Sequence, residues 1–138
     1  MATIDMQTMR YINLLDRASH VKTRKCFVYN NTIIFAVPRA QISQAIGPHA
    51  AHVRDIEQKL GRKVRIIADQ ENIAQAGAFI EDIIAPIHYR SLESTPEGLI
   101  ITAGNPQTKA TLLGRNKKRF EELKQIVEDT FGVDLKII

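Results

Sequence analysis

Two short stretches of the chain combine residue types that are suited to binding an anion. Gly47-Pro48-His49-Ala50 and Gly114-Arg115-Asn116-Lys117 each follow two apolar residues and precede an amphipathic helix. The N–H groups at a helix N-terminus, together with the partial positive charge of the helix dipole, form a site for a phosphate. A glycine at such a turn has no side chain to keep the ligand at a distance. Both stretches are therefore candidate phosphate sites.

The second stretch is the more basic of the two, because Arg115, Lys117, Lys118 and Arg119 surround Asn116. Such a run is either a solvated helix start or a phosphate contact. Cations at a helix N-terminus oppose the dipole at a cost of roughly a few tenths of a kcal/mol each, which favours a functional purpose. The candidate binding residues are Gly47, His49, His52 and Arg54 in the first stretch, and Gly114, Arg115, Asn116, Lys117, Lys118 and Arg119 in the second.

Other chemistry has little support in the sequence. His49 and His52 have the spacing of a metal-binding pair, but no Cys or carboxylate beside them completes a site, so surface histidines explain them. Glu121 and Glu122 are explained by pairing with lysines along one helix. The chain has no Ser/His/Asp elbow, P-loop or His-Glu-x-x-His motif. We expect no catalysis, no metal and no cofactor.

The two stretches belong to a long internal repeat. An offset of 67 carries Gly47 to Gly114 and Val53 to Phe120, and an offset of 71 then carries Gly61 to Gly132. Four extra residues make about one helical turn, so the second copy's helix lengthens without rotating its buried face. We expect two domains, 1–68 and 69–138, with a boundary and a helix N-cap within residues 69–71.

Apolar periodicity predicts the same order in both halves: helix, strand, strand, helix, helix, strand. In the first half we expect these elements at 4–18, 21–29, 32–37, 39–46, 50–60 and 63–68. In the second half we expect them at 72–85, 87–94, 99–102, 108–113, 116–131 and 133–138. Ile46, Leu113 and the pairs Ile66-Ile67 and Ile137-Ile138 are expected in the core, with Ile46 and Leu113 as alternative groove-lining residues. Each half is then a two-layer α/β unit of the α+β kind.

Composition and charge indicate a globular protein with an anionic partner. Hydrophobic residues make up 44% of the chain, charged residues 25%, and no apolar run reaches the roughly 18 residues of a membrane span. The first residues, 1–5, lack the features of a signal peptide, so we expect a cytoplasmic protein. Residues 1–68 hold 11 Lys and Arg against 4 Asp and Glu, whereas residues 69–138 hold 8 against 11. The single cysteine, Cys26, excludes an intrachain disulfide and is interpreted as a small apolar residue.

The apolar-apolar-Gly-x-x turn between two helices, set between a hairpin and a final strand, resembles the K-homology (KH) domain of type II. Two such domains in tandem, covering essentially the whole chain, resemble the archaeal short form of the NusA transcription factors. The resemblance implies two KH-like domains, each with a three-stranded mixed sheet, and a groove for about four nucleotides beside each turn. The second glycine of the KH loop is replaced in both copies, by Ala50 and by Lys117.

These observations predict a protein that binds single-stranded RNA. The resemblance implies that this RNA is nascent transcript and that the protein acts in transcription termination or antitermination. We expect the second turn to bind phosphate mainly by charge. The first turn, where Pro48 removes a backbone donor, is expected to bind weakly or to serve another purpose. One alternative is a protein-interaction module that docks on RNA polymerase with degenerate loops. Another is a KH protein of RNA processing or of the ribosome.

Overall fold

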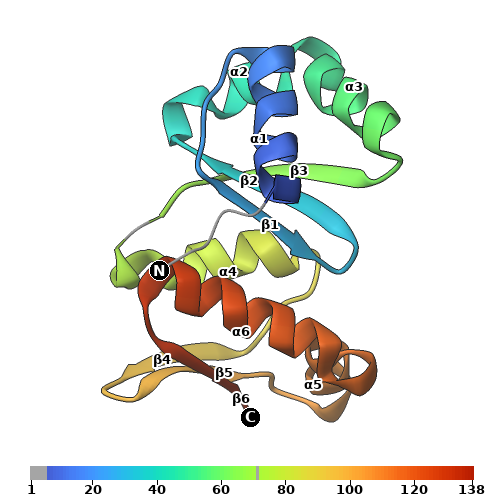
Figure 1. The fold of residues 1–138 in the computed structure, drawn as a ribbon. Coiled ribbons are helices and arrows are strands. Elements are labelled where there is room, and N and C mark those ends of the chain that lie inside the picture. The colour runs from blue at the N-terminus through green and yellow to red at the C-terminus, as the bar shows by residue number, and fades with distance from the viewer. Residues whose placement is uncertain (1–5, 71) are drawn as a thin grey trace. The chain divides into compact units, whose positions relative to one another are not determined.

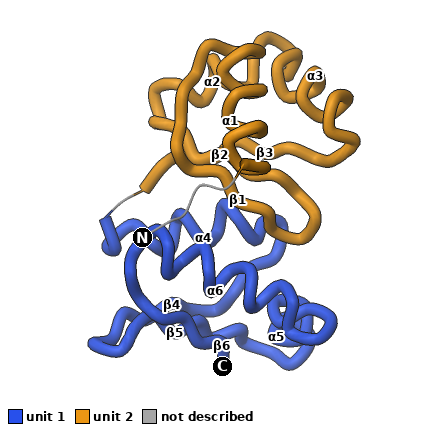
Figure 2. The backbone as a smooth tube through the Cα atoms, in the orientation of Figure 1, with its two compact units in different colours: residues 1–2, 71–138 blue, residues 3–70 orange. Residues whose placement is uncertain are grey.

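The computed structural model describes residues 6–70 and 72–138, and these fall into two compact units (Figure 2). The N-terminal unit ends at Gln70, two residues beyond the boundary expected from the repeat. Asp69 continues this unit, because its N–H donates to the Val37 carbonyl at 2.8 Å and its carboxylate pairs with Lys25 at 2.6 Å. Glu71 and the expected first residues of the opening helix, 4–5, lie outside the described residues.

Both units have the predicted order α-β-β-α-α-β (Figure 1). The N-terminal unit contains α1 Met6–Ser19, β1 Lys25–Tyr29, β2 Thr32–Val37, a 3-10 turn Arg39–Gln41, α2 Ile42–Ile46, a 3-10 turn Pro48–Ala50, α3 Ala51–Leu60 and β3 Lys63–Ala68. The C-terminal unit contains a 3-10 turn Ile73–Gln75, α4 Ala76–Ile84, β4 Ser91–Thr95, β5 Gly98–Thr102, α5 Pro106–Leu113, a 3-10 turn Arg115–Lys117, α6 Lys118–Phe131 and β6 Asp134–Ile137.

Each unit is built on a three-stranded mixed sheet, as predicted. The strand orders are β1-β2-β3 and β4-β5-β6. In each sheet the central strand pairs antiparallel with its hairpin partner and parallel with the last strand of the unit. In the N-terminal unit the helices cover one face of the sheet (Figure 1), so this unit has two layers.

The cores are formed by the apolar faces that the periodicity predicted. In the N-terminal unit Leu15 of α1, Phe35 of β2 and Ile56 of α3 are fully buried together, and the half-buried Cys26 packs against this cluster. In the C-terminal unit the rings of Phe79 and Phe131 meet edge to face, with centroids 5.5 Å apart. Such a contact contributes about 0.5–1.5 kcal/mol beyond the buried area.

The predicted four-residue insertion is confirmed in the last helix of each unit. Helix α3 has 10 residues and α6 has 14. Both helices end at a glycine in the left-handed conformation, Gly61 with φ +65° and Gly132 with φ +70°. Glycine is the residue that most often adopts this left-handed conformation at the end of a helix. The extra turn thus leaves the helix ends equivalent.

Several expected boundaries are wrong for local reasons. The strand expected from residue 21 begins at Lys25, because Thr23 Oγ1 donates to the Ala36 carbonyl and accepts from the Lys25 N–H, forming a side-chain turn. The strand expected from residue 87 begins at Ser91, because the Ile87 N–H turns back to the Ile84 carbonyl at 3.0 Å.

Two further expectations fail at the ends of elements. The helix N-cap expected within residues 69–71 is Asn72, whose Oδ1 accepts from the Ala74 N–H at 2.9 Å. Ile138, expected in the core, is 60% exposed. Its backbone still bonds to Ile101 and Ala103, but strand alternation puts its side chain on the face of the exposed Lys136.

Candidate nucleic-acid interface

The two turns have nearly identical backbones although their sequences differ. Gly47 ends α2 with φ +80° and ψ 168°, and Gly114 ends α5 with φ +73° and ψ 179°. The third and fourth residues of both turns are left-handed: φ is 54° and 61° at His49 and Ala50, and 55° and 59° at Asn116 and Lys117. Left-handed backbone costs about 1–2 kcal/mol at a residue with a Cβ. The fold therefore imposes the same strained shape on both sequences.

Each turn leads directly into a helix that has no side-chain cap. The turn is closed by the N–H of its fourth residue, from Ala50 to the Gly47 carbonyl at 3.1 Å and from Lys117 to the Gly114 carbonyl at 3.2 Å. Neither α3 nor α6 has a side-chain hydrogen bond at its N-cap, whereas Asn105 caps α5 by accepting from the Thr108 N–H at 2.8 Å. The N-termini of α3 and α6 are thus suited to an external anion.

The C-terminal turn presents its cations to solvent. Arg115, Asn116, Lys117 and Lys118 are all exposed, and Arg119 is half-buried. These residues lie around one turn, because they occupy its second to fourth positions and the first residues of α6. Exposed cations at a helix N-terminus attract a phosphate electrostatically, with an energy that added salt reduces.

The N-terminal turn offers fewer charges. Pro48 and His49 are exposed in the turn, Arg54 is exposed on α3, and His52 is half-buried. The offset of 67 places Glu121, an acid, at the position of Arg54 in the other copy. The first turn therefore keeps the backbone geometry, but Arg54, the candidate residue with a permanent positive charge, lies outside the turn itself.

The half-buried candidates His52 and Arg119 contact the preceding helix. His52 Nδ1 lies 2.8 Å from the Gln44 carbonyl oxygen, and Arg119 donates from Nη1 to the Thr111 carbonyl at a longer 3.4 Å. Sequence reasoning treated both side chains as RNA contacts and overlooked Gln44 and Thr111. One signal was available, since Pro48 has no N–H to donate to the carbonyl four residues before it.

Each turn is preceded by a half-buried apolar residue, and in each unit a carboxylate binds the start of the last strand. Ile46 and Leu113, just before the glycines, are only half-buried, while the preceding Ala45 and Leu112 are buried. The alternative interpretation of Ile46 and Leu113 as groove-lining residues thus fits their exposure better than a core position. At the start of the last strands, carboxylates accept from backbone N–H groups: Glu57 from Val64 at 3.0 Å and Asp134 from Leu135 at 2.9 Å.

Lys124 has a different partner from the one expected along α6. Its Nζ lies 3.3 Å from Asp134 Oδ1 and 5.9 Å from the centroid of the Phe120 ring. The bond from the Leu135 N–H, followed by the interaction with Lys124, lowers the pKa of Asp134 below its ordinary value. Lys124 therefore joins α6 to β6 and adds little free charge to the turn.

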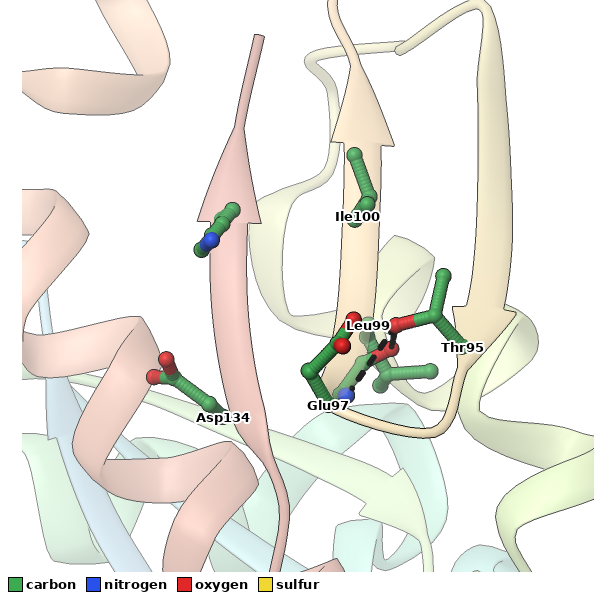
Figure 3. A pocket seen from close by; sticks show the side chains of 7 residues that line it. Thr95, Glu97, Leu99, Ile100 and Asp134 are labelled. Carbon is green, nitrogen blue, oxygen red and sulfur yellow. Dashed lines mark hydrogen bonds between the residues drawn. The ribbon is translucent and has the colours of Figure 1, made fainter.

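The pocket at the β4-β5 hairpin is too small to be the nucleic-acid site. Its volume is about 20 Å³, and Thr95, Leu99 and Asp134 are among its lining residues (Figure 3). Thr95 Oγ1 donates to the Gly98 carbonyl at 2.8 Å and accepts from the Gly98 N–H at 3.2 Å, which closes the hairpin. This volume holds about one water molecule.

No group of three or more His, Cys, Asp and Glu side chains within residues 6–70 and 72–138 is placed to hold a metal ion. None of the helices in these ranges combines the length and apolarity needed to cross a bilayer.

Comparison with known proteins supports the resemblance stated from the sequence. No protein-family model matches the chain. A protein of Halococcus morrhuae named "Probable transcription termination protein NusA" is 22% identical over 134 residues, which cover 96% of this chain and 94% of the relative. Proteins of the same name from Methanocaldococcus jannaschii and Methanococcus vannielii are each 26% identical, over 92% and 77% of this chain and 70% and 62% of their own lengths. The resemblance to the archaeal short form of NusA is therefore confirmed.

A solved structure shows the same fold over the full length. The structure titled "Crystal structure of APE1850" superimposes with a TM-score of 0.67 at 18% sequence identity, covering 98% of this chain and 99% of the other. This likeness, together with the two mixed sheets, confirms the predicted fold of two tandem KH-like α+β units.

Proposed function

We propose that this chain, with its resemblance to archaeal short-form NusA, is an RNA-binding transcription factor that binds single-stranded nascent RNA. By this proposal it acts in transcription termination or antitermination. The observation that carries the proposal is the repeated turn: a glycine, one intervening residue and then two left-handed residues, at the start of a helix without a side-chain cap, in both units. Such a backbone offers N–H groups and a positive dipole to a phosphate.

The C-terminal turn binds RNA mainly through its side-chain charge. Lys117 occupies the fourth position, where a glycine would let the sugar–phosphate chain approach more closely. Its ammonium group, the ammonium group of Lys118 and the guanidinium group of Arg115 compensate by direct attraction to the phosphate. Because all three are exposed, their attraction is screened by salt and varies with ionic strength.

The N-terminal turn binds RNA mainly through its backbone. Ala50 at the fourth position has a small side chain, so a phosphate can come close to the N-terminus of α3. Pro48 supplies no N–H, so this turn has one donor fewer than the other. His49 and Arg54 are exposed beside it and remain the proposed auxiliary contacts.

The bases of the bound strand lie beside the half-buried Ile46 and Leu113. Apolar contact and hydrogen bonds to base edges provide the base interactions there, because aromatic residues make up only 6% of the chain and none is Trp. We propose that stacking contributes less than phosphate contact to the affinity.

A second candidate function is docking on RNA polymerase through the same units, without RNA contact. Its support is the absence of the second glycine from both turns and the net charge of −3 on residues 69–138. A third is association with ribosomal or processing RNA, which uses the same chemistry. The names of the three archaeal relatives favour a role in transcription.

The salt dependence of RNA affinity tests the proposal. The dissociation constant for a fluorescein-labelled single-stranded RNA is measured by anisotropy across a salt series for the unmodified protein, Lys117→Ala and Lys118→Ala. Each substitution removes one phosphate contact and should reduce the slope of log K against log salt by about 0.7. Lys109→Ala, which removes an exposed cation of α5, is the control and should leave the slope unchanged.

Two outcomes would reject the proposal. RNA binding that is absent, or independent of salt, together with retention of the protein on RNA polymerase would favour the docking function. The RNAs recovered with the protein from cells distinguish nascent transcripts from ribosomal or processing RNA.

A further inference from the structure

The side chain five residues after each turn glycine lies directly over that glycine. A Cβ built on Gly47 would be 2.7 Å from Cγ and Nδ1 of His52, and one built on Gly114 would be 2.8 Å from Cγ of Arg119. Real Cβ atoms do not approach other atoms so closely, so the absent side chain at each glycine is what admits the imidazole or the guanidinium stem. The same packing occurs in two copies with different residue types.

Each of these side chains also reaches a backbone carbonyl of the preceding helix. In both copies that carbonyl belongs to the residue three positions before the glycine, Gln44 in α2 and Thr111 in α5. The last four carbonyls of a helix have no N–H partner within the helix. The partner that would follow Gln44 by four residues is Pro48, which has no N–H. His52 supplies the missing donor to the Gln44 carbonyl, and Arg119 donates to the Thr111 carbonyl over a longer distance.

The offset of 67 relates all three parts of this arrangement: carbonyl, glycine and covering side chain. Gln44 corresponds to Thr111, Gly47 to Gly114 and His52 to Arg119. Imidazole and guanidinium differ in shape, yet both carry N–H donors on a planar group. A planar side chain that carries an N–H donor is therefore the property that the two copies share. We call this bond across the turn, from His52 to Gln44 or from Arg119 to Thr111, the cross-turn contact.

We propose that His52 and Arg119 are positioning residues that hold each RNA-binding turn in shape through the cross-turn contact, while RNA contacts the turn and not these side chains. This inference rests on the proposed RNA binding and deepens it. It reassigns two residues that the sequence presented as phosphate contacts. The turn needs such support because its third and fourth residues are left-handed without being glycine.

A positioning role and a contact role predict different salt behaviour. Loss of a phosphate contact lowers the slope of log K against log salt by about 0.7 for a single strand, whereas loss of a positioning bond weakens binding at every salt concentration alike. Arg119→Ala should therefore weaken RNA binding roughly threefold to tenfold with an unchanged slope, as expected for one lost hydrogen bond. Lys118→Ala, its exposed neighbour, should lower the slope.

The experiment uses the full chain and exchanges the donors between copies. Affinity for a fluorescein-labelled single-stranded RNA of about 12 nucleotides, enough for four at each turn with a spacer, is measured across a salt series. The variants are His52→Ala, Arg119→Ala, His52→Arg and Arg119→His. The exchanges should restore affinity to within about twofold of the unmodified protein, because each new residue is the one that serves the other copy. Thermal unfolding of every variant identifies loss of the fold.

Amide hydrogen exchange by NMR gives a readout that needs no RNA. The Ala50 and Lys117 N–H groups close the two turns, so their exchange should become roughly threefold to tenfold faster in His52→Ala and Arg119→Ala respectively. The exchanged-donor variants should restore protection.

The two readouts separate the two hypotheses. If the unmodified protein binds no RNA, the proposed function fails, while faster amide exchange still supports the cross-turn contact. If RNA binds and both alanine variants leave affinity and amide exchange unchanged, the positioning role is overturned. A slope reduced by about 0.7 in Arg119→Ala would instead make Arg119 a phosphate contact.

Discussion

The turn after α2 and the turn after α5 differ much more in charge than in shape. Their glycines agree within 11° in ψ, at 168° and 179°, and their left-handed residues agree within 3° in φ. One turn contains Pro48 and His49, and the other contains Arg115 and Lys117. The flanking helices and the glycine therefore determine the backbone conformation of the turn. The other side chains of the turn can then differ and set its affinity for an anion.

The two units also differ in the charged residues at the start of their last strands. The residues corresponding to Lys124 and Asp134 of the C-terminal unit are Glu57 and Lys63 of the N-terminal unit, with both charges reversed. A carboxylate nevertheless reaches the same strand amide in each unit, from Glu57 to Val64 and from Asp134 to Leu135. Because the amide of an outer strand needs an acceptor, the hydrogen bond persists although the accepting carboxylate comes from α3 in one unit and from β6 in the other.

The two turns should differ most in the unfolding free energy that is lost when their glycines are replaced by alanine. Gly47→Ala places a methyl group 2.7 Å from the His52 ring and 3.0 Å from the His52 backbone N, whereas in Gly114→Ala the nearest atoms belong to the flexible Arg119 side chain. We expect losses in unfolding free energy of about 2–3 kcal/mol for Gly47→Ala and about 1–2 kcal/mol for Gly114→Ala. Urea unfolding followed by circular dichroism measures both. A larger loss at Gly114 would refute the structural equivalence.

A glycine at the fourth turn position should distinguish the effect of close phosphate approach on RNA affinity from the effect of side-chain charge. Ala50→Gly and Lys117→Gly both remove left-handed strain and should each raise the unfolding free energy by about 0.5–1 kcal/mol. Ala50→Gly should keep or improve RNA affinity, while Lys117→Gly should weaken it because a cation is lost. Anisotropy titrations at fixed salt decide this, and tighter binding by Lys117→Gly would show that close approach matters more than charge.

The smallest effect concerns the acid dependence of the C-terminal unit. The N–H of Leu135, and next Lys124, lower the pKa of Asp134 in the folded state. Its contribution to stability is therefore present above the unfolded pKa of about 3.9 and is lost as the pH falls through the lower folded value. Asp134→Asn should reduce the loss of stability on acidification below about pH 4. Lys63→Gln, at the equivalent position of the other unit, is the control. Equal acid unfolding of Asp134→Asn and the unmodified protein would remove this role.

Local pattern predicted most of this fold, because repeats, periodicity and glycine positions are properties of neighbouring residues. The four-residue lengthening of α6 and its end at Gly132 followed directly from the two offsets. Contacts between distant segments were not predictable in this way. Lys124 has near neighbours of opposite charge on its own helix, yet it pairs with Asp134 across a loop.

The candidate site was predicted in its position but not in its internal contacts. The two glycines and the exposed cations of the C-terminal turn lie where the sequence placed them. The cross-turn contact depends on how two helices pack across a left-handed turn, which periodicity does not encode. Only the missing N–H of Pro48 pointed to the Gln44 carbonyl, and that signal has no counterpart at Arg115.

In the proposed function, one backbone turn binds RNA by charge in one unit and by backbone groups in the other. The most direct test of this difference exchanges the three residues after the glycine and measures RNA affinity against salt. Replacing Arg115, Asn116 and Lys117 by Pro, His and Ala should lower the slope of log K against log salt by about 1.4, for two lost cations. The reciprocal change at Pro48, His49 and Ala50 should raise the slope by a similar amount. Slopes that stay the same in both exchanges would contradict the claim.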